Sequence, residues 1–247
     1  MNLDQLGRVV RFTVVAAVVA LPASAGAFTV FAAKSLSTAL PAIDASPTYS
    51  FAGSDTLERQ IAAGAPADVF ASASPRYTHR LYAAGRCGKP VTFATNVLVL
   101  ITPTANPAGI HSINDLAHGP AKRLAIGSTA VPVGIYTRIL LRRLSLSAVL
   151  TRNTVSSEPD VGSIVSKVAL GSADAGIVYY TDWKAASDRL ALIRVPKAGQ
   201  PSIRYEICAV RRSGAAKAAA NRFIRKVLSP AGRRILKSNG FGLPPLK

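Results

Sequence analysis

The sequence predicts an α/β fold of two lobes, which are joined by hinge strands and enclose a cleft. From residue 28 onward, apolar runs rich in β-branched and aromatic residues alternate with helical stretches, the pattern of a parallel sheet with crossover helices. Two longer β-type runs, at residues 91–102 and 203–211, are candidates for strands that cross between two α/β blocks. We therefore expect one lobe to comprise residues 28–93 and 205–247, and the other residues 94–204.

The first block predicts strands that are each followed by a helix. Glycine ends two of these helices, at Gly64 and Gly85, because it adopts the left-handed conformation that commonly terminates a helix. The expected strands are residues 28–33, 50–52 and 68–73, and the expected helices are a short one after Ser35, residues 54–63 and residues 75–84.

The second block repeats this alternation, and two further helices close the chain. Ser229 and Pro230 have the residue types of an N-cap and a first helical position, and Gly240 ends the last helix. The expected helices of the second block are residues 113–116, 134–144 and 161–170, its expected strands are residues 123–126 and 177–180, and a closing helix covers residues 215–228.

Residues 1–27 have the features of an export signal. Arg8 and Arg11 give a positively charged start, residues 12–21 form an apolar core, and the small residues 23–27 are typical of a cleavage site. An uncleaved anchor is the alternative, because no charge interrupts the stretch that follows Arg11. A cleaved signal places the remaining chain in the periplasm or on the extracytoplasmic face of the membrane.

The charge of the chain is strongly positive. Its 30 Lys and Arg residues and 12 Asp and Glu residues give a formal net charge of +18. A nucleic-acid-binding protein is disfavoured, because the basic residues are dispersed and are not interleaved with aromatic residues. A basic surface that attracts anions at long range is the better interpretation.

Cys87 and Cys208 are the only cysteines, and both lie in the part of the chain that is expected to be exported. In an oxidising compartment a disulfide between them is favoured over two unrelated buried thiols. These cysteines and the scattered His79, His111 and His118 do not have the spacing of metal ligands. We expect no cofactor.

Four helix starts follow strand-like runs and offer hydroxyls or bare backbone amides, near Ser35, Ser54, Val133 and Val161. The first amides of a helix have no partner within it and carry partial positive charge. Several such ends that point at one spot bind an anion. Two starts fall in each lobe, so we expect a site shared across the cleft, and lobes that close on the ligand. A serine at such a position is alternatively a simple N-cap.

Seven segments, in this order, resemble the periplasmic molybdate-binding proteins of ABC-type uptake systems. They are residues 31–36 (FAAKSL), 51–57 (FAGSDTL), 64–70 (GAPADVF), 131–136 (VPVGIY), 160–161 (DV), 173–182 (ADAGIVYYTD) and 229–242. The resemblance implies a type II-like periplasmic-binding-protein fold without enzymatic activity. It also implies a monomer that delivers its ion to a membrane permease driven by an ATPase.

The resemblance also implies a set of ligand-binding groups. They are the hydroxyls of Ser35, Ser54 and Tyr179 and the backbone amides of Val133 and Val161, which would contact the metal only through the oxygens of its oxyanion. Such a site offers donors and few acceptors. Molybdate, tungstate and sulfate suit it, whereas hydrogen phosphate carries a proton that needs an acceptor. Cavity size would separate sulfate from the two larger ions, and the sequence does not distinguish molybdate from tungstate.

Two residues depart from the pattern of that family. Lys34 stands where a small residue is usual, and it either contacts the anion or points to solvent. Asp55 follows Ser54, and it is either a first-turn acid that favours the helix dipole or an acceptor inside the cleft.

Two rival functions start from the same residues. Ferric iron could be held by the adjacent Tyr179 and Tyr180, but it would also need carboxylates or histidines from the other lobe, and no good candidate stands near Ser35 or Ser54. A serine hydrolase would use Ser35 or Ser54 as its nucleophile. It is disfavoured, because neither serine lies in a G-x-S-x-G turn and no histidine is placed beside them.

Overall fold

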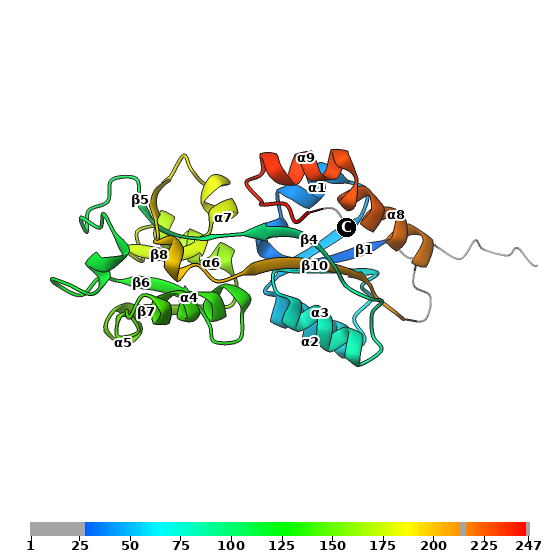
Figure 1. The fold of residues 1–247 in the computed structure, drawn as a ribbon, viewed down its shortest axis with the longest axis horizontal. Coiled ribbons are helices and arrows are strands. Elements are labelled where there is room, and N and C mark those ends of the chain that lie inside the picture. Colours follow the sequence, from blue (N-terminus) through cyan, green and yellow to red (C-terminus); the bar gives the residue numbers. More distant parts are fainter. Residues whose placement is uncertain (1–27, 213–215, 246–247) are drawn as a thin grey trace, which may run out of the picture.

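The computed structural model describes residues 28–212 and 216–245, and it consists of two α/β blocks that lie at opposite ends of the long axis (Figure 1). The export signal expected at residues 1–27 lies outside the described residues. Each block is built on one five-stranded sheet. The two-lobed α/β architecture expected from the sequence is therefore confirmed. Within the described part, no helix has both the length and the apolar character needed to span a membrane.

The first sheet has the strand order β2-β1-β3-β10-β4. Strands β2 and β3 both pair parallel to β1, whereas β10 pairs antiparallel to β3 and to β4. Helices α1, α8 and α9 cover one face of this sheet, and α2 and α3 cover the other (Figure 1). The strands are β1 (Thr29–Ala33), β2 (Thr48–Ala52), β3 (Val69–Ser72), β4 (Val91–Asn96) and β10 (Ile203–Ala209), and the helices are α1 (Ala39–Ile43), α2 (Ser54–Ala62), α3 (Pro75–Ala83), α8 (Lys217–Leu228) and α9 (Pro230–Ser238).

The second sheet has the strand order β7-β6-β8-β5-β9. Strand β6 is parallel to β7 and β8, and β5 is antiparallel to β8 and β9. Its strands are β5 (Leu98–Pro103), β6 (Leu124–Gly127), β7 (Thr154–Glu158), β8 (Ala175–Tyr179) and β9 (Leu190–Arg194), and its helices are η2 (Ile113–Leu116), α4 (Pro132–Arg143), α5 (Val149–Asn153), α6 (Val161–Ala169), α7 (Tyr180–Lys184) and η3 (Lys197–Gly199).

The apolar sequence runs form the inner strands, as expected for strands that are covered on both faces. Every residue of β3, β6 and β8 is buried. Strand β7, which the sequence analysis did not predict, has alternating burial at the edge of its sheet. Its sequence, TVSSE, is mostly polar, so it does not form an apolar run that would predict a strand.

The chain crosses between the sheets at two places. The run at residues 91–102 is interrupted at Val97, because β4 pairs in the first sheet and β5 pairs in the second. The sequence predicted that the run at residues 203–211 crosses back between the sheets. In the structure, β10 pairs only within the first sheet, and the chain crosses back before it, at residues 195–202. The division into lobes at residues 93/94 and 204/205 remains a prediction.

Cys87 and Cys208 are free thiols in the structure, so the expected disulfide is not formed in it. Both are buried in a small apolar cluster of the first block, and their side chains hydrogen-bond to each other. This contact lowers the pKa of Cys87 and raises the pKa of Cys208. The two thiols are therefore neighbours and not unrelated buried residues.

Candidate functional site

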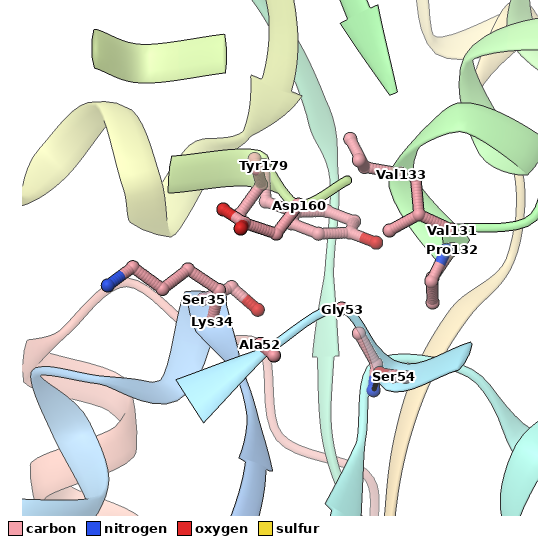
Figure 2. Close-up of a pocket in the computed structure, with 12 residues that line it drawn as sticks. Lys34, Ser35, Ala52, Gly53, Ser54, Val131, Pro132, Val133, Asp160 and Tyr179 are labelled. Carbon is pink, nitrogen blue, oxygen red and sulfur yellow. Dashed lines mark hydrogen bonds between the residues drawn. The ribbon is translucent and has the colours of Figure 1, made fainter. Parts of the chain in front are cut away.

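One cavity between the two blocks is lined by all five residues that the sequence analysis proposed as ligand-binding. It contains about 210 Å³ of space that atoms do not fill, part of which is open to solvent. Ser35 and Ser54 approach it from the first block, and Val133 and Tyr179 from the second (Figure 2). Val161, also of the second block, completes the set.

The sheet topology explains why these residues meet. Each follows or ends a strand of the parallel part of its sheet: β1, β2, β6, β7 and β8. The carboxyl ends of parallel strands lie at the same edge of a sheet, where ligands of open α/β folds bind. The two such edges face each other across the cavity, so residues that are far apart in the sequence converge.

Ser54 is the first residue of α2, and its side chain is almost fully buried. The N-cap of this helix is Gly53, and Ser54 makes no capping hydrogen bond. Its hydroxyl oxygen instead accepts a hydrogen bond from the backbone amide of Ala73, at 3.1 Å. Because the oxygen already accepts, its proton is available to donate into the cavity. The N-cap interpretation of this serine is therefore wrong.

Ser35 lies in η1 (Lys34–Leu36), a single 3-10 turn directly after β1, and it is also buried. It makes no capping hydrogen bond either. Its hydroxyl lies 2.8 Å from the hydroxyl of Tyr205 on β10. The short helix expected after Ser35 is α1, which begins at Ala39, and the serine itself is held by a residue far along the chain.

Val133 and Val161 present backbone amides at the starts of α4 and α6. Val133 follows Pro132 in the first turn of α4, and Val161 is the first residue of α6. Amides of a first turn have no carbonyl partner within the helix, and the helix dipole makes their end of the helix positive. Both helices are long enough, with 12 and 9 residues, to have a developed dipole.

Gly134 is what brings α4 so close to the end of β6. A Cβ atom at this position would lie 1.9 Å from the carbonyl oxygen of Ser128 and 2.3 Å from that of Gly127. Only a residue without a side chain permits this approach. The VPVGIY segment therefore fixes the Val133 amide at the cavity by allowing backbone to pack on backbone.

Tyr179 ends β8, and only 2% of its surface is exposed. Within the described part of the chain, its hydroxyl has no hydrogen-bond partner. Burial raises the pKa of this hydroxyl well above its ordinary value, so it remains a protonated donor. An unpaired buried hydroxyl is costly. Because Tyr179 lines the cavity, its hydroxyl is available as a donor there.

Lys34 lines the edge of the cavity, but its amine points away from the space between Ser35 and Tyr179 (Figure 2). Its alkyl chain crosses to the other block and packs on Gly162, where a Cβ atom would lie 2.7 Å from Lys34 Cε. Of the two roles left open for Lys34, pointing away from the anion is the one the structure favours.

Asp55 does not line the cavity. Its carboxylate pairs with Arg59 one turn along α2, at 3.0 Å. The acidic residue in the cavity wall is Asp160, which the sequence analysis treated only as a helix start. Asp160 caps α6, because its two carboxylate oxygens accept from the amide of Ser163 at 3.0 Å and from its hydroxyl at 3.4 Å.

The rival functions find little support in this geometry. Tyr180, the second tyrosine of the iron hypothesis, begins α7 and does not line the cavity. The described residues include no group of three or more His, Cys, Asp or Glu side chains that could hold a metal ion. None of the three histidines lines the cavity, so Ser35 and Ser54 have no base beside them there.

Comparisons with known proteins show the family of the chain. Residues 28–242 match the sequence profile of the bacterial extracellular solute-binding proteins. The molybdate-binding protein ModA of Mycobacterium tuberculosis is 35% identical over 225 residues, which are 87% of this chain and 84% of that protein. The molybdate-binding protein ModA of Escherichia coli is 31% identical over 238 residues, 89% of this chain and 90% of that protein.

A solved structure, the periplasmic molybdate-binding protein of Azotobacter vinelandii, superimposes with a TM-score of 0.79 at 26% identity, and covers 88% of this chain and 100% of that one. These relatives bind solutes for transporters and are not enzymes. The profile match spans most of the chain, and the chain therefore belongs to the family of bacterial extracellular solute-binding proteins.

Proposed function

We propose that this protein captures molybdate or tungstate outside the cytoplasmic membrane and delivers it, as a monomer, to an ABC permease and its ATPase. The observation that carries the proposal is the convergence of five donor groups from both blocks on one cavity, including the unpartnered hydroxyl of Tyr179. The proteins of M. tuberculosis and E. coli that it resembles over most of its length are molybdate-binding proteins.

The donor set suits a tetrahedral dianion. An anion buried between the blocks loses its hydration, so its oxygens must receive hydrogen bonds from the protein. Ser35, Ser54 and Tyr179 supply hydroxyls, and the starts of α4 and α6 supply amides and partial positive charge. The bound ion is cargo and not a cofactor.

Hydrogen phosphate fits this donor set less well. Its proton needs an acceptor, and the carboxylate in the cavity wall, that of Asp160, is engaged with Ser163. Molybdate and tungstate carry no proton at neutral pH, so every oxygen can accept from the protein. We therefore expect the protein to select against phosphate by hydrogen-bond polarity and against sulfate by size.

The location and the charge of the protein are consistent with this role. Members of its family act outside the cytoplasm, and we propose that residues 1–27 direct this chain there. The formal net charge of +18 attracts small anions at long range.

Isothermal titration of the exported protein with molybdate, tungstate, sulfate and phosphate at one ionic strength tests the proposal. We expect one-to-one binding of molybdate and tungstate, and much weaker binding of sulfate and phosphate. Preference for phosphate would make Asp160 an acceptor in the cavity. Failure to bind any of the four ions would contradict the proposal.

Replacing Ser54 with alanine is expected to weaken molybdate binding about 10- to 100-fold, because a hydrogen bond to a charged group contributes about 1.5–3 kcal/mol. The readout is the Kd from titration. Ser229→Ala is the matched control, since Ser229 caps α9 through Gly232 and does not line the cavity. It should cost about 1 kcal/mol of stability and leave the Kd unchanged. Equal Kd values for the two variants would remove Ser54 from the site.

A further inference from the structure

A buried chain of hydrogen bonds connects Ser35 to the place where the polypeptide first crosses between the blocks. The Ser35 hydroxyl contacts the Tyr205 hydroxyl at 2.8 Å, and Tyr205 accepts from the side-chain amide of Asn96 at 3.4 Å. The same amide donates to the hydroxyl of Thr181 at 2.9 Å. Ser35 and Tyr205 belong to the first block, Asn96 is the last residue of β4, and Thr181 lies on α7 of the second block.

The side-chain amide of Asn96 indicates which atoms donate in this chain of hydrogen bonds. The Asn96 side-chain oxygen accepts from the backbone amide of Val97 at 2.9 Å, which leaves the Asn96 nitrogen as the donor to Tyr205 and Thr181. Either hydroxyl of this pair can donate; since Tyr205 accepts from Asn96, the arrangement in which its own proton goes to the oxygen of Ser35 is favoured. Ser35 then has its proton free, and the cavity is where that proton can be donated.

Tyr205 is held firmly in this position. Its side chain has no exposed surface, and its ring packs edge-on against Phe93, Tyr179 and Phe241 at centroid distances of 6.3, 5.9 and 5.3 Å. Burial raises the pKa of its hydroxyl well above the ordinary value, so the proton that Ser35 accepts is retained. The residue does not line the cavity, so its hydroxyl acts on a ligand through Ser35, while its ring supports Tyr179.

We infer that Tyr205 and Asn96 are positioning residues that keep Ser35 a hydrogen-bond donor and thereby set the selectivity between unprotonated and protonated oxyanions. The inference rests on the proposed function. The amide of Ala73 has the same effect on Ser54. In the first block, then, each serine hydroxyl has one acceptor position filled by a group behind it, which favours donation into the cavity over acceptance of the proton of hydrogen phosphate.

Replacing Tyr205 with phenylalanine tests this inference, because the ring is kept and only the hydroxyl is lost. Ser35 can then rotate and accept a proton. We expect the ratio of the phosphate Kd to the molybdate Kd, measured by titration at pH 8, to fall about tenfold. Asn96→Asp should lower the ratio further. A carboxylate there accepts from Tyr205, so Tyr205 must accept from Ser35 and the Ser35 oxygen faces the cavity as an acceptor.

Two comparisons separate positioning from a loss of structure. In the Ser35→Ala background, Tyr205→Phe should leave the ratio unchanged, since the two residues act as a unit. The matched control is Tyr49→Phe, which removes a hydroxyl that bonds the carbonyl oxygens of Leu40 and Asp44 away from the cavity. It should leave the ratio unchanged. Both ions are dianions at this pH, so changes in overall charge or stability cancel in the ratio.

The results that would overturn the inference are distinct from those that would overturn the proposed function. A Tyr205→Phe ratio equal to that of Tyr49→Phe, or a full effect of Tyr205→Phe without Ser35, would refute the positioning role while molybdate binding by the wild type stands. Absence of molybdate binding by the wild type would refute the proposed function itself.

Discussion

Replacing Gly53 with alanine is expected to weaken molybdate binding about 100-fold, and to leave the thermal unfolding of the ligand-free protein almost unchanged. Gly53 has an ordinary helix N-cap conformation, with φ −60° and ψ 138°, which alanine also adopts. A Cβ atom here would lie 2.5 Å from the carbonyl oxygen of Pro159 in the other block, and 2.7 Å from Oδ1 of Asp55, a side-chain atom that can turn aside. The Pro159 oxygen belongs to the backbone just before α6 and cannot move aside, so the two blocks cannot approach as closely.

Gly162→Ala is the matched control for this prediction. It also adds a Cβ atom that faces the other block, but the atom it meets is Cε of Lys34, at 2.7 Å. The end of a lysine side chain is flexible and can move to another rotamer, so we expect the Kd to change less than about threefold. Titration and thermal unfolding of both variants provide the measurement. Wild-type affinity in Gly53→Ala would show that molybdate does not bind in this closed arrangement.

Oxidation of Cys87 and Cys208 is expected to raise the free energy of unfolding by about 4–5 kcal/mol, because it closes a long loop in the unfolded chain. The two thiols hydrogen-bond to each other, and this bond lowers the pKa of Cys87. Cys87 is therefore the thiol that more readily forms the attacking thiolate. A dithiol–disulfide oxidant of the export compartment accepts the two electrons and two protons, and a disulfide links the two sulfur atoms.

Denaturant unfolding with and without a reductant measures this effect. The exported protein should contain no titratable thiol when it is unfolded, and a reductant should lower its transition midpoint. The double variant Cys87→Ala and Cys208→Ala should not respond to the reductant. Two titratable thiols in exported protein would contradict the prediction, and would match the free thiols of the structure.

The sequence predicted the fold where the apolar pattern is strong. The runs that became β1, β3 and β8 are continuous because these strands are buried from both sides. The prediction was less accurate where a strand is polar, or where one continuous run contributes strands to two different sheets. The polar strand β7 was missed, and so was β9, although its sequence is apolar. Residues 91–102 were read as one strand because Val97, where the chain changes sheets, is itself apolar and leaves the run unbroken.

The candidate site was predicted because its residues follow strands at helix starts, which is a local signal. Ser54, Val133 and Val161 could be proposed from their own segments. The groups behind them could not. Tyr205 is 170 positions from Ser35, and Asn96 is 109 positions from Tyr205. No spacing rule connects such residues, and only the pairing of β10 with β3 and β4 brings them together.

The contact between Gly53 and Pro159 also bears on how an ion would leave. Gly53 backs directly onto the Pro159 backbone, and the hydroxyl-bearing Ser54 and Tyr179 are 1% and 2% exposed. An ion held between the two blocks is gripped by donors from both of them, so it is released fully only when the blocks separate. We expect the dissociation rate to equal the rate at which the blocks separate, whatever the concentration of free anion. Transfer to a permease would then require the membrane partner to separate the two blocks.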